Sequence, residues 1–229
     1  MSKLYDRTGD KYDYRSNNPY TKHLRKKEVE LIKRFAKGKV LDIGCGTGYH
    51  LNFVKGVGID SSQKMIDLAN KNGFNVRMSR AEKIPFAKDS FDTVMSMYGV
   101  LNFTDYKKAI REVKKVLKKD GIVIISVDSV YDKNYTMGEK RKLKIDKYTQ
   151  TKKFNIEGVK TVLHLFTKDE VLELFKGFEL LHFDSVFRNI NPIWGRFKIN
   201  ETEKKKLKED YRYPKEYGCF YLFVFRKKI

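Results

Sequence analysis

The chain has 229 residues, of which 41% are hydrophobic, and it carries a formal net charge of +20. This length and composition fit one globular domain, residues 1–229, with a core of its own, and they exclude a disordered chain. Two distant cysteines outside any CxxC pattern exclude a disulfide framework and a structural zinc site, and the lack of a long apolar run or an apolar leader excludes a membrane span and a secretory signal. We therefore expect a soluble cytoplasmic protein with neither a metal nor a membrane partner.

The first half of the chain alternates between patterns typical of helices and patterns typical of strands. Apolar residues recur at helical spacing in some segments, and short β-branched runs alternate with them. Helices are predicted at residues 20–37, 49–54, 61–73 and 104–119. Strands are predicted at residues 39–44, 57–60, 75–78, 91–97 and 121–127. Such alternation indicates a parallel sheet that helices cover on both faces.

The pattern changes after the fifth predicted strand. Residues 128–163 are polar, basic and alternating, which predicts a small strand-rich insertion outside the main sheet. A helix is predicted at residues 167–175, where Thr167 is the expected N-cap, Glu170 completes a capping box and Gly177 ends the helix.

Two aromatic strands are predicted near the end of the chain, at residues 178–187 and 219–228, with a lysine-rich helical stretch near 201–210 between them. No apolar crossover helix joins these strands, so we expect them to pair antiparallel. The predicted fold class is α/β: a Rossmann-like, seven-stranded, mostly parallel sheet with helices on both faces and an antiparallel last strand. The strand-rich insertion follows the fifth strand.

Residues 40–48 (VLDIGCGTG) are the segment most indicative of chemistry. A strand that runs into glycines and then into a helix brings bare backbone against a ligand, at the carboxyl end of the first strand. Asp60 ends the second predicted strand, where a carboxylate can accept hydrogen bonds from both hydroxyls of a ribose. The alternatives are that Asp60 only caps a helix and that the glycines only form a tight turn.

The glycine spacing distinguishes two cofactors. Dinucleotide sites have the pattern GxGxxG, with the pyrophosphate at a helix N-terminus. Here Gly44, Gly46 and Gly48 follow the pattern GxGxG, and Asp42 precedes them. A carboxylate in that place would repel a pyrophosphate, but it suits the positively charged end of a sulfonium amino acid. The pattern therefore favours S-adenosylmethionine over a nicotinamide dinucleotide.

Four segments in order resemble one known family. VLDIGCGTG (40–48) and VGIDSSQKMIDLA (57–69) resemble the first two motifs of class I S-adenosylmethionine-dependent methyltransferases. Residues 80–103 resemble the loop and fourth strand of the subgroup that includes the ubiquinone/menaquinone-biosynthesis methyltransferases, and residues 110–127 resemble the helix and strand that follow. The resemblance implies a methyltransferase with S-adenosylmethionine as cofactor.

The resemblance also implies roles for individual residues. Gly44, Gly46 and Gly48 would form the turn against the methionine moiety and the ribose, with Cys45 between them as a small packed residue. Asp42 would organise the amino end of the methionine. Around the nucleoside and the methyl group, the implied contacts are Asp60 on the ribose, Ser61, Ala81 and Glu82 on the adenine, and Ser96, Met97 and Tyr98 on the methyl-transfer face.

The implied organisation of the domain follows the same resemblance. An N-terminal lid and helix (1–37) precede a cofactor-binding core (38–127), a substrate-side insertion (128–163) and a C-terminal helix with a strand pair (164–229). The candidate lid residues are Tyr5, Tyr12 and Tyr14. Two departures from the family stand out, namely Arg80, where many relatives have an aspartate, and the short stretch between Gly48 and Asp60.

No catalytic residue can be assigned from the sequence, and two residues are candidates. Tyr98 either contacts the acceptor or packs in the core. His164 alternates with leucines on a predicted strand, which favours a structural histidine, with a role as catalytic base as the alternative. A general base is optional in methyl transfer, because it is needed only if the acceptor must lose a proton.

The methyl acceptor stays open between three hypotheses. The subgroup resemblance favours a small molecule. An RNA, for example a tRNA, is the alternative, because the positive charge is concentrated in residues 1–39, 131–163 and 188–229, interleaved with aromatic residues. Lysine-rich solvated surface explains the same charge without RNA. The third hypothesis is a non-catalytic protein that binds the cofactor and acts through a partner.

Overall fold

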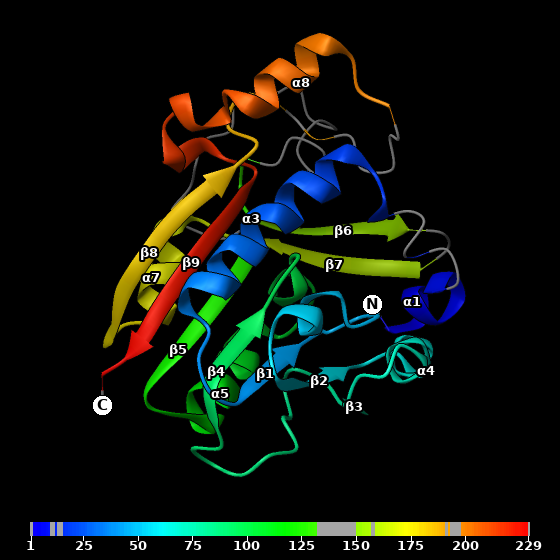
Figure 1. Cartoon of the computed structure of the whole chain (residues 1–229), viewed down its shortest axis with the longest axis vertical. Helices are drawn as coiled ribbons and strands as arrows, with labels where there is room; N and C mark the ends of the chain where they lie inside the picture. The colour runs from blue at the N-terminus through cyan, green and yellow to red at the C-terminus, as the bar shows by residue number, and fades with distance from the viewer. Residues whose placement is uncertain are drawn as a thin grey trace.

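The computed structural model describes residues 2–9, 12, 16–131, 150–156, 159–190, 192 and 198–228. Within these residues the main feature is a seven-stranded sheet with the strand order β3-β2-β1-β4-β5-β9-β8 (Figure 1). Its strands are β1 (Val40–Ile43), β2 (Gly56–Asp60), β3 (Val76–Met78), β4 (Phe91–Ser96), β5 (Leu117–Asp128), β8 (Phe178–Val186) and β9 (Phe220–Lys227).

The pairing of the strands confirms the predicted fold class. β1 lies parallel to both β2 and β4, β2 is parallel to β3, and β4 is parallel to β5. β9 is antiparallel to β5 on one side and to β8 on the other. The strand order reverses beside β1, between β2 and β4, which is where open α/β sheets bind ligands.

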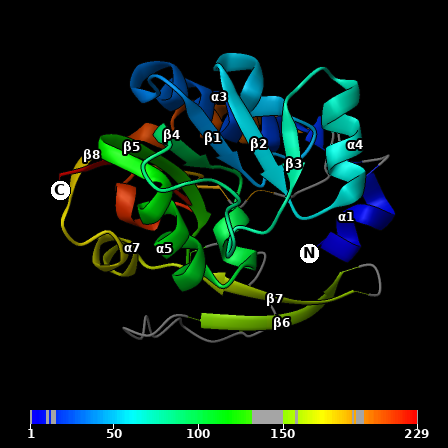
Figure 2. The ribbon, with the colours of Figure 1, turned by 90° about the horizontal axis from the view of Figure 1, so that it is seen from below.

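Helices cover both faces of the sheet, as Figure 2 shows for α3 and α4 on one side and α5 and α7 on the other. The first face carries α3 (Pro19–Phe35), the 3₁₀ helix η2 (Tyr49–Phe53) and α4 (Gln63–Lys71). The second carries η3 (Val100–Phe103), α5 (Tyr106–Val116) and α7 (Lys168–Leu174). Strand residues alternate between the two cores: Ile122 and Ile124 pack under α3, whereas Val123 and Ile125 pack under α5.

The boundary between α5 and β5 differs from the prediction of one helix over 104–119. α5 begins at Tyr106, because the Asp105 side chain accepts the Lys108 N–H as N-cap. It ends at Val116, because Leu117 takes an extended conformation and pairs with Phe91 of β4. Leu117 is fully buried there, so tertiary packing overrides its helical periodicity.

The predicted insertion contains a separate antiparallel hairpin of β6 (Gln150–Ile156) and β7 (Val159–Leu165). The hairpin lies outside the main sheet on the α5 side, and its free end is on the same side of the molecule as α1 (Ser2–Thr8) in both views (Figures 1 and 2). Where the chain is described, the strand-rich insertion is confirmed; residues 132–149 lie outside that part.

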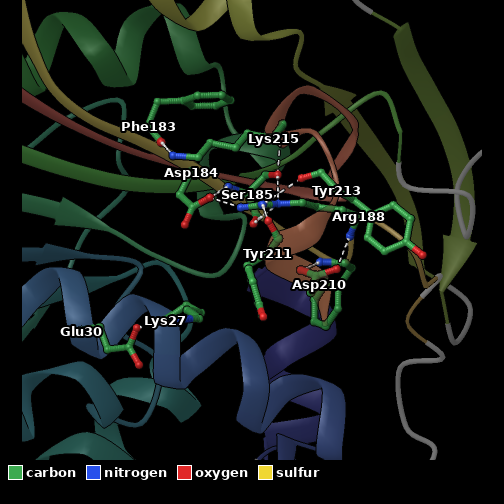
Figure 3. Close-up of polar contacts among 11 residues, drawn as sticks. Lys27, Glu30, Phe183, Asp184, Ser185, Arg188, Asp210, Tyr211, Tyr213 and Lys215 are labelled. Atoms are coloured by element: carbon green, nitrogen blue, oxygen red, sulfur yellow. Dashed lines mark hydrogen bonds and ion pairs between the residues drawn. The ribbon is translucent and has the colours of Figure 1, made fainter. Parts of the chain in front are cut away.

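The connection between β8 and β9 contains α8 (Glu201–Lys208), η4 (Asp210–Arg212) and η5 (Lys215–Tyr217). A cluster around Arg188 ties it to the end of β8 (Figure 3). The Arg188 guanidinium pairs with Asp184 and donates to the carbonyl of Tyr213 at 3.0 Å. Asp210 accepts the N–H groups of Phe187 and Arg188 at 2.8 and 2.6 Å. In the described part of the chain, no helix combines the length and apolar character that a membrane crossing requires.

Candidate functional site

A cavity opens at the carboxyl ends of β1, β2 and β4, where the strand order reverses. Its empty volume, including the space open to solvent, is about 860 Å³. The described residues that line it come from the strand ends, from α1, α4 and η3, and from the loop after β3. They are Tyr5, Tyr12, Ile43, Gly44, Gly46, Asp60, Ser61, Met65, Ser79, Arg80, Ala81, Glu82, Met97, Tyr98, Val100, Phe103 and Thr104.

The turn after β1 has left-handed backbone at Gly44 (φ 71°) and Gly46 (φ 53°), which favours glycine at both positions. The surroundings of the two residues differ. A Cβ on Gly44 would lie 2.4 Å from Cγ2 of Val100, whereas a Cβ on Gly46 would meet nothing closer than the Tyr12 ring at 3.8 Å. Gly44 is therefore required by packing, and Gly46 presents open backbone to the cavity. Gly48 does not line the cavity; it packs against Phe74.

Asp60 is fixed beside this turn by two backbone amides. Its Oδ2 accepts the N–H of Gly46 at 3.0 Å, and its Oδ1 accepts the N–H of Ser62 at 2.9 Å. Burial raises the pKa of Asp60, although these amides oppose the rise. The N-cap of α4 is Ser62, whose hydroxyl accepts the Met65 N–H. Since Ser62 caps the helix, Asp60 is left to present a carboxylate to the cavity.

Asp42 lies behind the cavity wall, on the α3 side of the sheet. It is 1% exposed, and its Oδ2 has no hydrogen-bond partner among the described residues. Burial raises the pKa of Asp42 to about 7, against the opposing charge of His50. Ser96 at the end of β4 is similarly buried, with an unpartnered hydroxyl among the described residues. Neither residue lines the cavity, and Cys45, also expected at the cofactor, packs beneath Gly58.

Tyr98 is held by polar contacts from α3 and β5. The buried Glu28 carboxylate accepts the Tyr98 N–H at 2.9 Å, and Ser126 hydrogen-bonds the same carboxylate. The Tyr98 hydroxyl lies 2.9 Å from the hydroxyl of Thr21. Tyr98 has φ 58°, a conformation that a bulky residue adopts only where its surroundings impose it. This arrangement places the Tyr98 ring in the cavity wall.

One end of the cavity is formed by the loop after β3 and by Ser61, so Ser61, Ala81 and Glu82 all line it, and their contact with an adenine stays a prediction. Glu82 accepts the Asp105 N–H at 3.0 Å and pairs with Arg80 at 3.1 Å. Arg80 therefore extends toward Glu82 in the position where relatives often have an aspartate.

The N-terminal segment borders the same cavity. Tyr5 and Tyr12 both line it and pack edge to face, with ring centroids 5.7 Å apart. α1 is attached to α4, because Asp6 accepts the Ser62 hydroxyl at 2.6 Å. Tyr14, the third predicted lid residue, lies outside the described residues.

His164 does not line the cavity. Its Nε2 lies 3.0 Å from the Glu170 carboxylate, and its ring centroid is 4.2 Å from that of Tyr106. Glu170 was predicted to complete a capping box with Thr167. Thr167 does accept the Glu170 N–H, but the Glu170 side chain is used by His164, so the prediction was half right.

Several site residues were not singled out from the sequence. Ile43, Met65, Ser79, Val100, Phe103 and Thr104 line the cavity, and Glu28 and Thr21 orient Tyr98. Glu28 had one usable signal, because it shares a helix face with the apolar residues Leu24 and Ile32, one turn away on either side. Among the described residues no cluster of three or more His, Cys, Asp or Glu side chains could hold a metal ion.

The cavity fits an adenosyl amino acid. Asp60 offers acceptors for two hydroxyls, Gly46 admits close backbone contact, and apolar side chains from β1, α4 and η3 line the space for a flat base. The orphaned Oδ2 of Asp42 and hydroxyl of Ser96, both buried behind the amino-acid end, are polar atoms left to interact with a polar group.

Comparison with known proteins agrees with this geometry. A family model for a methyltransferase domain matches residues 41–125. The chain is 37% identical over 197 residues to the uncharacterized protein MJ1252 of Methanocaldococcus jannaschii, covering 80% of this chain and 77% of that protein. It is 35% identical over 136 residues to the demethylmenaquinone methyltransferase of Thermotoga maritima, covering 54% and 59%. A solved S-adenosylmethionine-dependent methyltransferase from Thermotoga maritima has the same fold, with a TM-score of 0.65 at 20% identity over 100% of both chains.

Proposed function

The chain belongs to the class I S-adenosylmethionine-dependent methyltransferases, in the subgroup of the ubiquinone/menaquinone-biosynthesis enzymes, and from this premise we propose that it methylates a small molecule. S-adenosylmethionine, when bound, supplies a methyl group that positively charged sulfur already activates. The protein's task is then to align the acceptor with that group and to exclude water, and proximity of this kind can lower a barrier by ~7–11 kcal/mol.

The residues around the cavity support a division of this task. Asp60 would accept the ribose hydroxyls, and Ser61, Ala81 and Glu82, which line the same cavity, would border the adenine. The turn at Gly46 would lie against the ribose and the amino-acid end. Asp42, from behind the wall, provides negative charge for the ammonium.

Tyr98 acts as a positioning residue on the methyl-transfer face, next to Met97. Burial raises the pKa of Tyr98, so its hydroxyl keeps its proton near neutral pH and does not serve as a base. The hydrogen bond with Thr21 and the bond from its amide to Glu28 hold the ring in one place. Methyl transfer by this site relies on alignment, and His164 takes no part in it.

The observation that carries the proposal of a small acceptor is the aromatic enclosure of the cavity. Tyr5 and Tyr12 from the N-terminal segment, Tyr98 after β4 and Phe103 of η3 surround it. A concave site with an aromatic wall and a few charged groups suits a small, partly apolar molecule. In this proposal residues 1–37 act as a lid and the 128–163 insertion borders the acceptor. The menaquinone-type acceptor in the name of the Thermotoga maritima relative supports the same class of substrate.

An RNA acceptor has less support. Among the described residues that line the cavity Arg80 is the one cation, and it pairs with Glu82 at 3.1 Å, so the cavity itself offers little positive charge to phosphate groups.

The test is methyl transfer from labelled S-adenosylmethionine into a fractionated cell extract. Label in the small-molecule fraction supports the proposal, whereas label in RNA or protein contradicts it. Asp60→Asn is the variant expected to lose transfer. Asp67→Asn is the matched control, since Asp67 lies on the exposed side of α4 and accepts a hydrogen bond from Gln63. No incorporation into any fraction, with intact cofactor binding, would favour a non-catalytic protein.

A further inference from the structure

Arg25 lies in α3 beside the amino-acid end of the cavity. Its guanidinium carbon is 4.0 Å from the centroid of the Tyr49 ring and 5.9 Å from that of Tyr98. Tyr98 and Tyr12 line the cavity, and a hydrogen bond with Arg25 counteracts part of the rise that burial causes in the pKa of Tyr12. Arg25 is therefore held by aromatic rings at the edge of the ligand space.

The positive charge of Arg25 is not balanced by a carboxylate in the described part of the chain. Its Nε is buried without a hydrogen-bond partner there. Lys27, on the outer face of the same helix, shows the contrast, because it pairs with Glu30 at 2.9 Å (Figure 3). A partly buried cation without a counter-charge costs free energy, which makes Arg25 a site for an anion.

The surroundings of Arg25 favour an anion as well. Arg25 and Lys22 line a polar groove together with Ser16, Asn17, Thr47 and Asn72, and the described residues of that groove include no carboxylate. Thr47 borders the groove, and the adjacent Gly46 borders the cavity. Both hollows therefore border the glycine turn, where the amino-acid end of the cofactor is expected.

The cavity itself offers little to a carboxylate group. Among its described lining residues Arg80 is the one cation, and Arg80 pairs with Glu82 at the nucleoside end. The amino-acid end of S-adenosylmethionine carries both an ammonium and a carboxylate. Asp42 provides negative charge for the ammonium, so the carboxylate lacks a positive partner unless α3 supplies one.

We infer that Arg25 binds the carboxylate of the cofactor's methionine moiety from α3, as a counterpart to Asp42. The inference rests on S-adenosylmethionine as cofactor. A guanidinium can donate two parallel hydrogen bonds to one carboxylate, and the flanking tyrosine rings fix its plane for this. Arg25 thereby couples cofactor binding to the helix that also orients Tyr98.

The test compares two ligands by calorimetry. S-adenosylhomocysteine has the amino-acid carboxylate, and 5′-methylthioadenosine lacks the whole amino-acid group. Arg25→Met is expected to weaken the affinity for S-adenosylhomocysteine by roughly 10- to 100-fold. Its affinity for 5′-methylthioadenosine is expected to change by less than about twofold. Arg25→Lys keeps the charge but loses the paired donors of the guanidinium, so its affinity for S-adenosylhomocysteine is expected to lie between those of the wild type and Arg25→Met. Lys27→Met is the control on the same helix and should match the wild type with both ligands.

The outcomes separate cleanly. Unchanged affinity of Arg25→Met for S-adenosylhomocysteine overturns the inference. So does an equal loss for both ligands, which would mean that Arg25 supports the fold; thermal melting of the same samples would then show a matching fall. If Arg25→Met keeps its affinity but loses methyl transfer, the groove holds an anionic group of the acceptor instead, and the inference is wrong. Failure of the wild type to bind S-adenosylhomocysteine would count against the cofactor, a different result.

Discussion

The carboxylate of Glu28 accepts the backbone N–H of Tyr98 at 2.9 Å, so a fully buried acid in α3 determines where β4 ends and the cavity wall begins. The other oxygen of Glu28 lies 3.0 Å from Nε2 of His50. Through these two contacts one side chain of α3 connects η2, which follows the glycine turn, with the cavity wall after β4.

Replacing Glu28 by alanine should be among the most destabilising changes in α3. It removes the acceptor that the Tyr98 amide, Ser126 and His50 share, and a buried donor left without a partner costs about 1–3 kcal/mol. Urea denaturation should show this fall in the free energy of unfolding. Glu30→Ala, which removes only the exposed pair with Lys27, should cost less than about 1 kcal/mol. Equal effects of the two variants would contradict this role of Glu28.

Asp42 should make the stability of the ligand-free protein depend on pH. Burial raises its pKa from 3.8 to about 7, so the folded state holds a proton that the unfolded chain releases near pH 4. This contribution to stability is complete below pH 4 and is lost as the pH rises to about 7, a change of up to ~4 kcal/mol. Urea titrations from pH 5 to 8 should show the fall in the wild type and a flatter profile in Asp42→Asn. Parallel profiles would rule out this effect of Asp42.

Two glycine substitutions should separate folding from binding. Gly44→Ala places a Cβ 2.4 Å from Val100 at φ 71°, so it should lower the melting temperature strongly. In Gly46→Ala the new methyl group makes an ordinary contact with the Tyr12 ring at 3.8 Å, so the cost is the left-handed backbone, about 1–2 kcal/mol, but the methyl group lies between two residues that line the cavity. We expect a folded Gly46→Ala protein with at least tenfold weaker S-adenosylhomocysteine binding, measured by calorimetry. Wild-type affinity in Gly46→Ala would show that the cofactor does not approach this turn.

Asp60→Asn should weaken cofactor binding without unfolding the protein. An asparagine side chain keeps the hydrogen bond from only one of the Gly46 and Ser62 amides, and it loses the charge-assisted bonds expected to two ribose hydroxyls. The expected loss in affinity for S-adenosylhomocysteine is roughly 10- to 100-fold. Homocysteine, which has neither ribose nor adenine, should bind the variant and the wild type equally. If the Asp60→Asn protein shows no thermal unfolding transition, Asp60 is needed for the fold and the prediction is wrong.

Part of the candidate site could be predicted because its signals are local, although Asp42, Cys45, Gly48 and Ser96, also predicted at the cofactor, do not line the cavity. Gly44, Gly46 and Asp60 sit at strand ends whose order follows from the alternation of helices and strands, and the structure places all three at one cavity. The end of α5 could not be predicted from the sequence, because the extended conformation of Leu117 depends on its pairing with Phe91 in another strand. Arg25, Glu28 and Thr21 were missed for a similar reason. On the sequence they are polar residues of a charged helix, and only the packing of α3 across β4 and β5 brings them to Tyr98.

Titration of the purified protein with S-adenosylhomocysteine in a calorimeter tests the central claim most directly, because it asks whether the glycine turn and Asp60 form a site for an adenosyl amino acid. The account predicts saturable binding at one site per chain, which Asp60→Asn weakens and Asp67→Asn leaves unchanged. Absence of binding, or tighter binding of a nicotinamide dinucleotide than of S-adenosylhomocysteine, would contradict it.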